Sequence, residues 1–236
     1  RIVTSGRVTP ADQQAVNAIH GRFRLDEATL AELQETARTV AGQLLAPTNV
    51  EFARASRDWR NYSTEQRKEV LAGFVGTLND TLGLDVETRF FNTPPVGNTI
   101  THGFYSTGTN SINLNTNPGS ISSFAYAVKT IFHEMIHAQY FEKTKGLTPD
   151  TALAMVESGD IDVTTAMAYF NAGPGMYLTR AQVSKIDYML NPHEQLAFTG
   201  QYFWEKEAAA RGVRDPLPTF AETNPLFEHL RDNRFA

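Results

Sequence analysis

The segment from Ser122 to Lys145 constrains the fold more than any other part of this chain. Its apolar residues recur at helical spacing, Ser122 or Ser123 stands in the N-cap position, and Gly146 follows as a C-terminal stop. These apolar residues are Phe124, Val128, Ile131, Phe132, Met135 and Ile136. A helix this apolar is stable only when other elements cover it, so the sequence predicts a buried central helix over residues 122–145.

This predicted helix carries the run His133-Glu134-Met135-Ile136-His137, an HExxH motif. Helical residues four apart lie on one face, so His133 and His137 can bind one tetrahedral metal ion. Glu134 then lies beside that ion, where it can take a proton from an activated water and pass it to a leaving amine. The motif therefore predicts a hydrolase with one catalytic Zn²⁺. The alternative is a hydrogen-bonded histidine pair on an ordinary core helix, with Glu134 as a surface charge.

Composition excludes several other classes of protein. The 236 residues are 41% hydrophobic, carry a net charge of −5 and include no cysteine, so His, Asp or Glu must hold any metal. The lack of clustered Lys and Arg argues against a nucleic-acid partner. No apolar run of about 18 residues and no signal peptide is visible, so we expect no membrane span. The chain begins with Arg1 instead of Met, which suggests a processed protein or a fragment of something longer. Secretion or delivery to a target compartment is favoured over residence in the cytoplasm.

We expect a helical region over residues 1–84 and a core over residues 85–236, together forming one compact unit. The predicted N-terminal helices span Pro10 to His20, Asp26 to Leu45 and Ser63 to about Leu82. Thr29 with Glu32, and Ser63 with Gln66, have the spacing of a capping box. In the core, a sheet is predicted within 85–117 from three alternating segments, Val86 to Phe91, Thr101 to Tyr105 and Ser111 to Asn115. The predicted fold class is α+β, with a small, mainly antiparallel three-stranded sheet packed on the motif helix.

The last part of the core, residues 148–236, is predicted to be helical. Helix starts are indicated at Thr148-Pro149, at Asp160 or Asp162 with an end near Gly173, and at Thr179 before a helix from Arg180 to Leu190. Asn191-Pro192 then begins a long helix that ends near Arg211, before Gly212.

A catalytic zinc usually has three protein ligands, so the two histidines need a partner downstream. Glu194, in the first turn of the helix that begins at Pro192, is the best candidate. At this point the chain resembles the gluzincin group of the zincin metallopeptidases, in which a glutamate on a following helix completes an HExxH site. The resemblance implies a zincin-like fold, with His133, His137 and Glu194 as metal ligands and Glu134 as the catalytic base.

Glu194 has an alternative explanation, because with Asn191 as N-cap it falls at the third helical position of a capping box. The other candidate ligands are His193, Asp187, Glu157 and His229. An oxyanion-stabilising Tyr or His is also expected, and the candidates are Tyr188, His193, Tyr202 and His229, of which we favour His193 and Tyr202. His20 and His102 are interpreted as structural or surface residues.

The leading hypothesis is a zinc-dependent endopeptidase that binds a protein or peptide substrate along Ser111 to Asn115, interpreted as an edge strand. An ordinary polar edge strand is the alternative for that segment. Two other functions stay open. One is hydrolysis of peptidoglycan or another amide, as a toxin or effector module of a larger protein. The other is a zincin-shaped binding domain without turnover.

Overall fold

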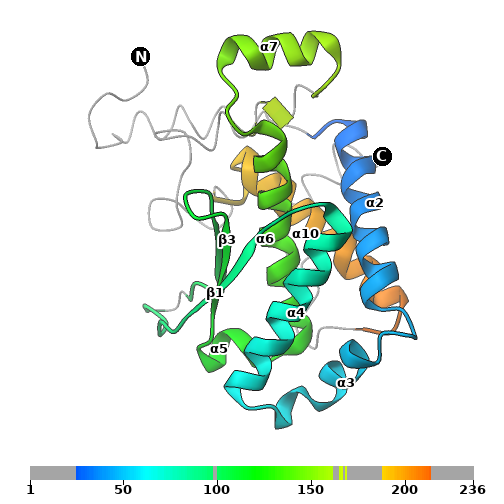
Figure 1. Cartoon of the computed structure of the whole chain (residues 1–236), viewed down its shortest axis with the longest axis vertical. Coiled ribbons are helices and arrows are strands. Elements are labelled where there is room, and N and C mark those ends of the chain that lie inside the picture. Colours follow the sequence, from blue (N-terminus) through cyan, green and yellow to red (C-terminus); the bar gives the residue numbers. More distant parts are fainter. Residues whose placement is uncertain (1–24, 98–99, 162–164, 167, 169–187, 214–236) are drawn as a thin grey trace.

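The computed structural model describes residues 25–97, 100–161, 165, 166, 168 and 188–213, and these form an α+β fold (Figure 1). Helix α6 (Phe124–Thr144) lies at the centre, with a small sheet on one side and helices α2, α4 and α10 packed on the others. The helix predicted over 10–20, and most of those predicted over 160–173 and 180–190, lie outside the described residues. None of the described helices is long and apolar enough to cross a bilayer.

The prediction of a buried helix over residues 122–145 is confirmed by α6. Of the two candidate caps, Ser123 begins the helix, and its side chain accepts a hydrogen bond from the Tyr126 N–H. Gly146 follows the end with φ +77°, a left-handed conformation that glycine adopts at low cost. All six apolar residues named in the prediction are buried. Burial of this whole face is what makes α6 the centre of the fold.

The N-terminal helices are α2 (Glu27–Leu44), α3 (Val50–Asp58), the 3₁₀ turn η1 (Trp59–Asn61) and α4 (Thr64–Leu82). The Ser63–Gln66 capping box at the start of α4 is confirmed. The cap expected at Thr29 is wrong, because Asp26 caps α2 and accepts the Thr29 N–H at 2.8 Å. The sequence analysis missed α3 and the four-residue helix α5 (Pro118–Ile121), which is too short for a clear helical period.

The sheet contains β1 (Glu87–Phe91), β2 (Gly103–Ser106) and β3 (Ser111–Asn115) in the order β1-β3-β2. β1 runs parallel to β3 and β2 runs antiparallel to it, so the sheet is mixed and the expectation of a mainly antiparallel sheet is wrong. The assignment of Ser111 to Asn115 as an edge strand is also wrong, since β3 is the central strand. Ser111 and Asn115 are buried and hydrogen-bonded instead of facing solvent, and Asn113 is half-buried.

Asn115 illustrates how a polar residue fits into this central strand. Its side-chain oxygen accepts the N–H groups of Thr93 (3.2 Å) and Asn117 (3.0 Å), and its amide donates to the carbonyls of Thr93 and Thr101, both at 2.8 Å. These four bonds use the two donors and two acceptor lone pairs of the amide. A fully buried Asn115 is therefore compatible with a stable strand.

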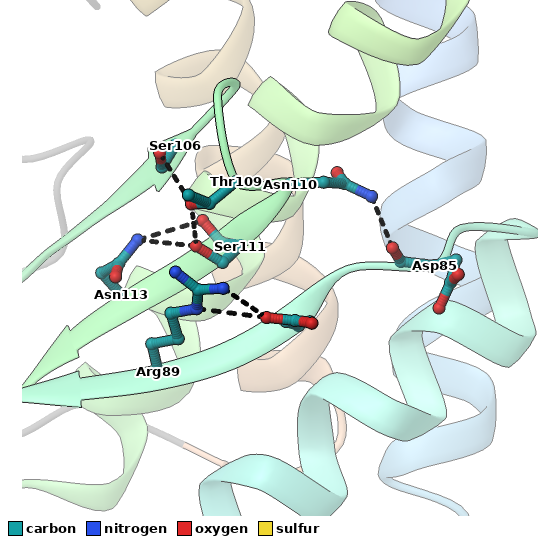
Figure 2. Close-up of polar contacts among 8 residues, drawn as sticks. Asp85, Arg89, Ser106, Thr109, Asn110, Ser111 and Asn113 are labelled. Carbon is teal, nitrogen blue, oxygen red and sulfur yellow. Dashed lines mark hydrogen bonds and ion pairs between the residues drawn. The ribbon is translucent and has the colours of Figure 1, made fainter.

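The turn between β2 and β3 is held by side-chain hydrogen bonds (Figure 2). Thr109 Oγ1 donates to Ser106 Oγ at 2.9 Å and lies 2.7 Å from Ser111 Oγ. Asn110 has φ +43°, which asparagine tolerates better than most residues, and its amide donates to the main-chain carbonyl of Asp85. These bonds hold the end of β2 next to the start of β3 and tie the turn to the residue that precedes β1.

Two helices follow α6 in the described residues. The start predicted at Thr148-Pro149 is confirmed by α7 (Pro149–Ser158), and the helix predicted from Pro192 is confirmed by α10 (Pro192–Ala210). α10 packs against both α2 and α6. It approaches α6 most tightly at Gly200, where a Cβ atom would lie only 2.8 Å from Ile136 Cγ1.

We expect Gly200→Val to destabilise the protein by roughly 2–3 kcal/mol, because the added methyl groups overlap the Ile136 side chain in a packed core. Urea denaturation followed by circular dichroism measures this free energy of unfolding. Gly76→Ala is the matched control, since Gly76 lies in α4 with no atom within 4 Å of an added Cβ. This control should gain about 0.5–1 kcal/mol from the lower backbone entropy of alanine. Equal stability of Gly200→Val and the wild type would contradict the packing at this helix crossing.

Candidate metal centre

Helices α6 and α10 bring together three side chains of the kinds that bind metal ions. His133 Nε2 lies 3.4 Å from one carboxylate oxygen of Glu194, and His137 Nε2 lies 3.6 Å from the other. One potential ligand atom from each of the three residues lies within 4.8 Å of the other two. All three side chains are buried. Within the part of the chain that the structure describes, this is the one group of three or more such residues that can hold a metal ion.

The separations of these atoms fit a tetrahedral zinc site. With bonds of roughly 2.0–2.1 Å, two ligand atoms of such a site lie about 3.3 Å apart. Each imidazole nitrogen lies near that distance, at 3.4 and 3.6 Å, from a different oxygen of the Glu194 carboxylate. Two imidazoles and one carboxylate are also a donor set that catalytic zinc sites use. The residues present therefore fit a zinc ion bound by three protein ligands.

The start of α10 differs from the capping-box alternative for Glu194. Asn191 occupies the N-cap position, but no side-chain cap hydrogen bond forms there. The Asn191 main-chain N–H and its side-chain amide both donate to the carbonyl of Tyr188. The Glu194 carboxylate instead faces the two imidazoles, and the residue is only 2% exposed. This arrangement favours the ligand interpretation over the cap.

Glu134 lies next to this cluster without belonging to it. One of its carboxylate oxygens accepts the main-chain N–H of Tyr105 in β2 at 2.9 Å. Burial raises the pKa of Glu134 to about 7. The neighbouring His133 opposes that rise, Glu194 adds to it, and the Tyr105 hydrogen bond opposes it. In the absence of a cation, the Glu134 carboxyl is thus close to the middle of its titration at neutral pH.

The histidines of the site differ in their affinity for protons. Burial, followed by the charge of His193, lowers the pKa of His137 well below its usual value. Burial also lowers the pKa of His193 to about 4. Burial opposes protonation of His133 too, but Glu194 and Glu134 outweigh it, so the net pKa of His133 is raised. A neutral imidazole is the form that binds a metal, so a proton and a cation compete at His133.

A pocket of about 260 Å³ opens beside the cluster. It is lined by Gly103, Phe104, Tyr105, Thr107, Glu134, His137, Tyr188, His193 and Glu194. His193 stacks on His137, with ring centroids 4.2 Å apart and planes inclined by 21°. Glu134, His137 and Glu194 therefore line the same cavity as Tyr188 and His193.

Tyr202, expected as a catalytic residue, lies elsewhere. Its ring packs against Phe203 and lies 5.1 Å from the Lys206 ammonium, and it does not line the pocket. Tyr202 is eight residues past Glu194, which is about 12 Å further along α10, so the two side chains do not share the pocket. Tyr188, a candidate that the sequence analysis did not favour, lines the pocket instead.

Glu157, another candidate ligand, does not join the cluster. Glu157 is exposed on α7, and the ring of His102 packs edge-on against Tyr126. Asp187, His229 and His20 lie outside the described residues. The contribution of β2 to the pocket, through Gly103, Phe104 and Tyr105, was not predicted from the sequence. No side-chain pattern indicates Tyr105, because its contribution to Glu134 comes from the main-chain N–H.

Strand β2, and not β3, forms the sheet edge beside the pocket. Asn115 N–H donates to the carbonyl of His102, so in this antiparallel register Phe104 and Ser106 also direct their main-chain groups toward β3. The main-chain groups of Gly103 and Tyr105 therefore face away from the sheet. The Tyr105 N–H bound to Glu134 lies on this outer side.

No protein-family model matches the sequence, and comparisons with curated proteins and with solved structures find no similar protein. Any assignment of function therefore depends on the residues and the geometry of the site itself.

Proposed function

We propose that the protein is a zinc-dependent metallopeptidase of the gluzincin-like zincin type, with one Zn²⁺ held by His133, His137 and Glu194. The observation that supports it is the convergence of Glu194, from α10, on the two imidazoles of the HExxH helix at 3.4 and 3.6 Å. A buried carboxylate is costly unless it is paired or binds a cation. An ion at this position offsets that cost.

The roles of the surrounding residues follow from their placement. When bound, the ion supplies Lewis-acid chemistry, because it polarises an amide carbonyl and lowers the pKa of a neighbouring water. Glu134 accepts the proton of that water and passes it to the leaving amine. The Tyr105 N–H holds one Glu134 oxygen at 2.9 Å, which restricts the carboxylate to one orientation during both transfers.

Stabilisation of the developing oxyanion is assigned to His193, with Tyr188 as the second donor in the pocket. His193 is neutral at physiological pH, because burial lowers its pKa to about 4, so its imidazole can donate one N–H. The stack on His137 holds the ring of His193 against the metal-binding cluster. Tyr202 has no part in this proposal.

The substrate is proposed to be a peptide in extended conformation that pairs with the outer side of β2. The main-chain groups of Gly103 and Tyr105 face away from β3, and both residues line the pocket together with Glu134. Because the Tyr105 N–H is bound to Glu134, the groups proposed to pair with the substrate are the N–H and carbonyl of Gly103 and the carbonyl of Tyr105. Main-chain pairing with a sheet edge accepts many side chains, which suits hydrolysis of peptide bonds in varied sequences. This replaces the expectation that β3 pairs with the substrate.

Removal of the metal tests the proposal. We expect the purified protein to contain about one equivalent of zinc and to cleave casein. Dialysis against a chelator should lower the cleavage rate at least ~100-fold, and added Zn²⁺ should restore it. His102→Ala is the control, because it removes a histidine that lies outside the cluster and should leave zinc content unchanged. Tight zinc binding without cleavage of casein or of a peptide library would instead favour a binding domain.

A further inference from the structure

Helices α6 and α10 face each other in antiparallel order along a row of polar side chains. At one end Lys129 Nζ lies 3.3 Å from Glu205 Oε1, and at the other end His137 faces Glu194. His133 lies one helical turn after Lys129 on α6. Gln201 lies one turn before Glu205 on α10. The antiparallel order therefore places Gln201 at the level of His133.

The orientation of the Gln201 amide is determined by Glu205. Gln201 Nε2 donates to Glu205 Oε1 at 3.0 Å. An ionised carboxylate only accepts hydrogen bonds, so the NH₂ group must face Glu205 and the carbonyl oxygen must face the other way. Glu205 is in turn held by Lys129, and the side chains of this ion pair are only 10% and 9% exposed. Gln201 is itself buried, with only 6% of the residue exposed.

The buried nitrogen of His133 requires an acceptor when the imidazole binds a metal. His133 faces Glu194 through Nε2, and its Nδ1 is buried without a hydrogen-bond partner among the described residues. An imidazole that binds a metal through Nε2 carries its proton on Nδ1, and this N–H usually donates to an oxygen. The Gln201 side chain is close enough to interact with the His133 ring.

We propose that Lys129, Glu205 and Gln201 form a positioning relay, in which the Gln201 carbonyl oxygen accepts the Nδ1–H of metal-bound His133. Lys129 fixes Glu205, Glu205 fixes the direction of the Gln201 amide, and that amide fixes the tautomer and the ring plane of His133. Gln201 is a positioning residue, because it touches neither the metal nor the substrate. The inference rests on the proposed metal centre and adds a support that the HExxH pattern does not contain.

A buried ion pair such as Lys129–Glu205 adds little net stability, because desolvation of the two charges offsets their attraction. Its effect is instead on geometry. Without Glu205 the Gln201 amide can rotate by half a turn and present its NH₂ group to His133, which is a donor facing a donor. The ion pair thus favours one of the two amide orientations, and this is the orientation that suits a metal ligand.

The affinity for zinc tests the relay in the full chain. Gln201→Met keeps an unbranched side chain of similar size but removes the acceptor, and we expect it to weaken Zn²⁺ binding about 10–100-fold. The dissociation constant is measured by competition with a chelating indicator, and the absorption spectrum of the Co²⁺-loaded protein reports the geometry of the ligands. The expected result is weaker binding with an altered Co²⁺ spectrum, while denaturation of the metal-free protein is little changed.

A rescue variant and a control complete the experiment. Gln201→Glu combined with Glu205→Gln exchanges the carboxylate and the amide, so an acceptor again faces His133 and the net charge is unchanged. We expect this double variant to recover most of the zinc affinity that Gln201→Met loses. Thr199→Val is the control, since Thr199 is buried on the same helix and its Oγ1 has no hydrogen-bond partner among the described residues. It should bind zinc like the wild type.

Two results would overturn the inference in distinguishable ways. Wild-type protein that binds neither Zn²⁺ nor Co²⁺ removes the metal centre itself and the relay with it. Wild-type protein that binds zinc tightly, while Gln201→Met binds it equally well with the same Co²⁺ spectrum, leaves the metal centre intact and refutes the relay alone.

Discussion

Glu134→Gln is expected to lower kcat/KM for peptide hydrolysis about 10²–10⁴-fold while the protein still binds one zinc ion. The amide has the shape of the carboxylate, and its oxygen can still accept the Tyr105 N–H that Glu134 binds at 2.9 Å. It cannot, however, accept a proton from water. Steady-state cleavage of a fluorogenic peptide, together with elemental analysis for zinc, measures both properties on the same sample.

The matched control is Glu142→Gln, which makes the same chemical change at an exposed position of the same helix. Glu142 is exposed and forms a surface ion pair with nearby Lys145, so activity and zinc content should stay at wild-type values. Hydrolysis that persists unchanged in Glu134→Gln would refute Glu134 as the base.

Glu194→Gln is expected to weaken zinc binding more than 100-fold, beyond the ~10–100-fold that loss of an outer-sphere contact causes. The substitution separates the two roles considered for Glu194. Glutamine serves as well as glutamate at the third position of a capping box, so a residue that only caps α10 tolerates the change. A metal ligand does not, because a neutral amide oxygen is a poor substitute for a charged one at zinc.

The stability of the metal-free protein provides the second measurement for Glu194→Gln. Glu194 is 2% exposed, and a buried charge is more costly than a buried amide. The unfolding free energy without metal should therefore stay constant or rise, while the stabilisation that added zinc provides disappears. Glu157→Gln, at an exposed position on α7, is the control. Zinc affinity within threefold of the wild type would identify Glu194 as a structural residue.

The parts of this molecule that the sequence predicts well are those determined by local patterns. Helix α6 follows from the spacing of its apolar residues and from Ser123 and Gly146 at its ends. The position of the two histidines on one face then follows from helix geometry. Glu194 is identified by a chemical requirement, the need for a third ligand, and not by a pattern of its own.

The order of the strands is not a local property, and the prediction that Ser111 to Asn115 forms an edge strand was wrong. Ser111 and Asn115 are polar and alternate with aliphatic residues, a pattern typical of an edge strand. Their hydrogen-bond partners include Thr93 and Thr101, whose positions in space depend on how the chain returns after β1. Buried asparagine cannot be distinguished from exposed asparagine until those partners are known.

The surroundings of the candidate metal centre were predicted only in part for a similar reason. Tyr105 acts through its main-chain N–H, which every residue except proline has, so its side chain carries no signal. Tyr202 lies on the same helix as Glu194, but sequence proximity does not give the direction of its ring. Tyr188 and His193 enter the pocket because of where α10 begins relative to α6.

The hydrogen bonds of Asn115 also determine how much the chain between β1 and β2 can vary. A single amide holds Thr93, near the start of this connection, and Thr101, near its end. The strands are therefore kept in register independently of the number of residues between these two points. Val96, within this span, is 79% exposed. Lengthening of a surface loop costs little free energy, so we expect this connection to tolerate an inserted residue better than the strands on either side do.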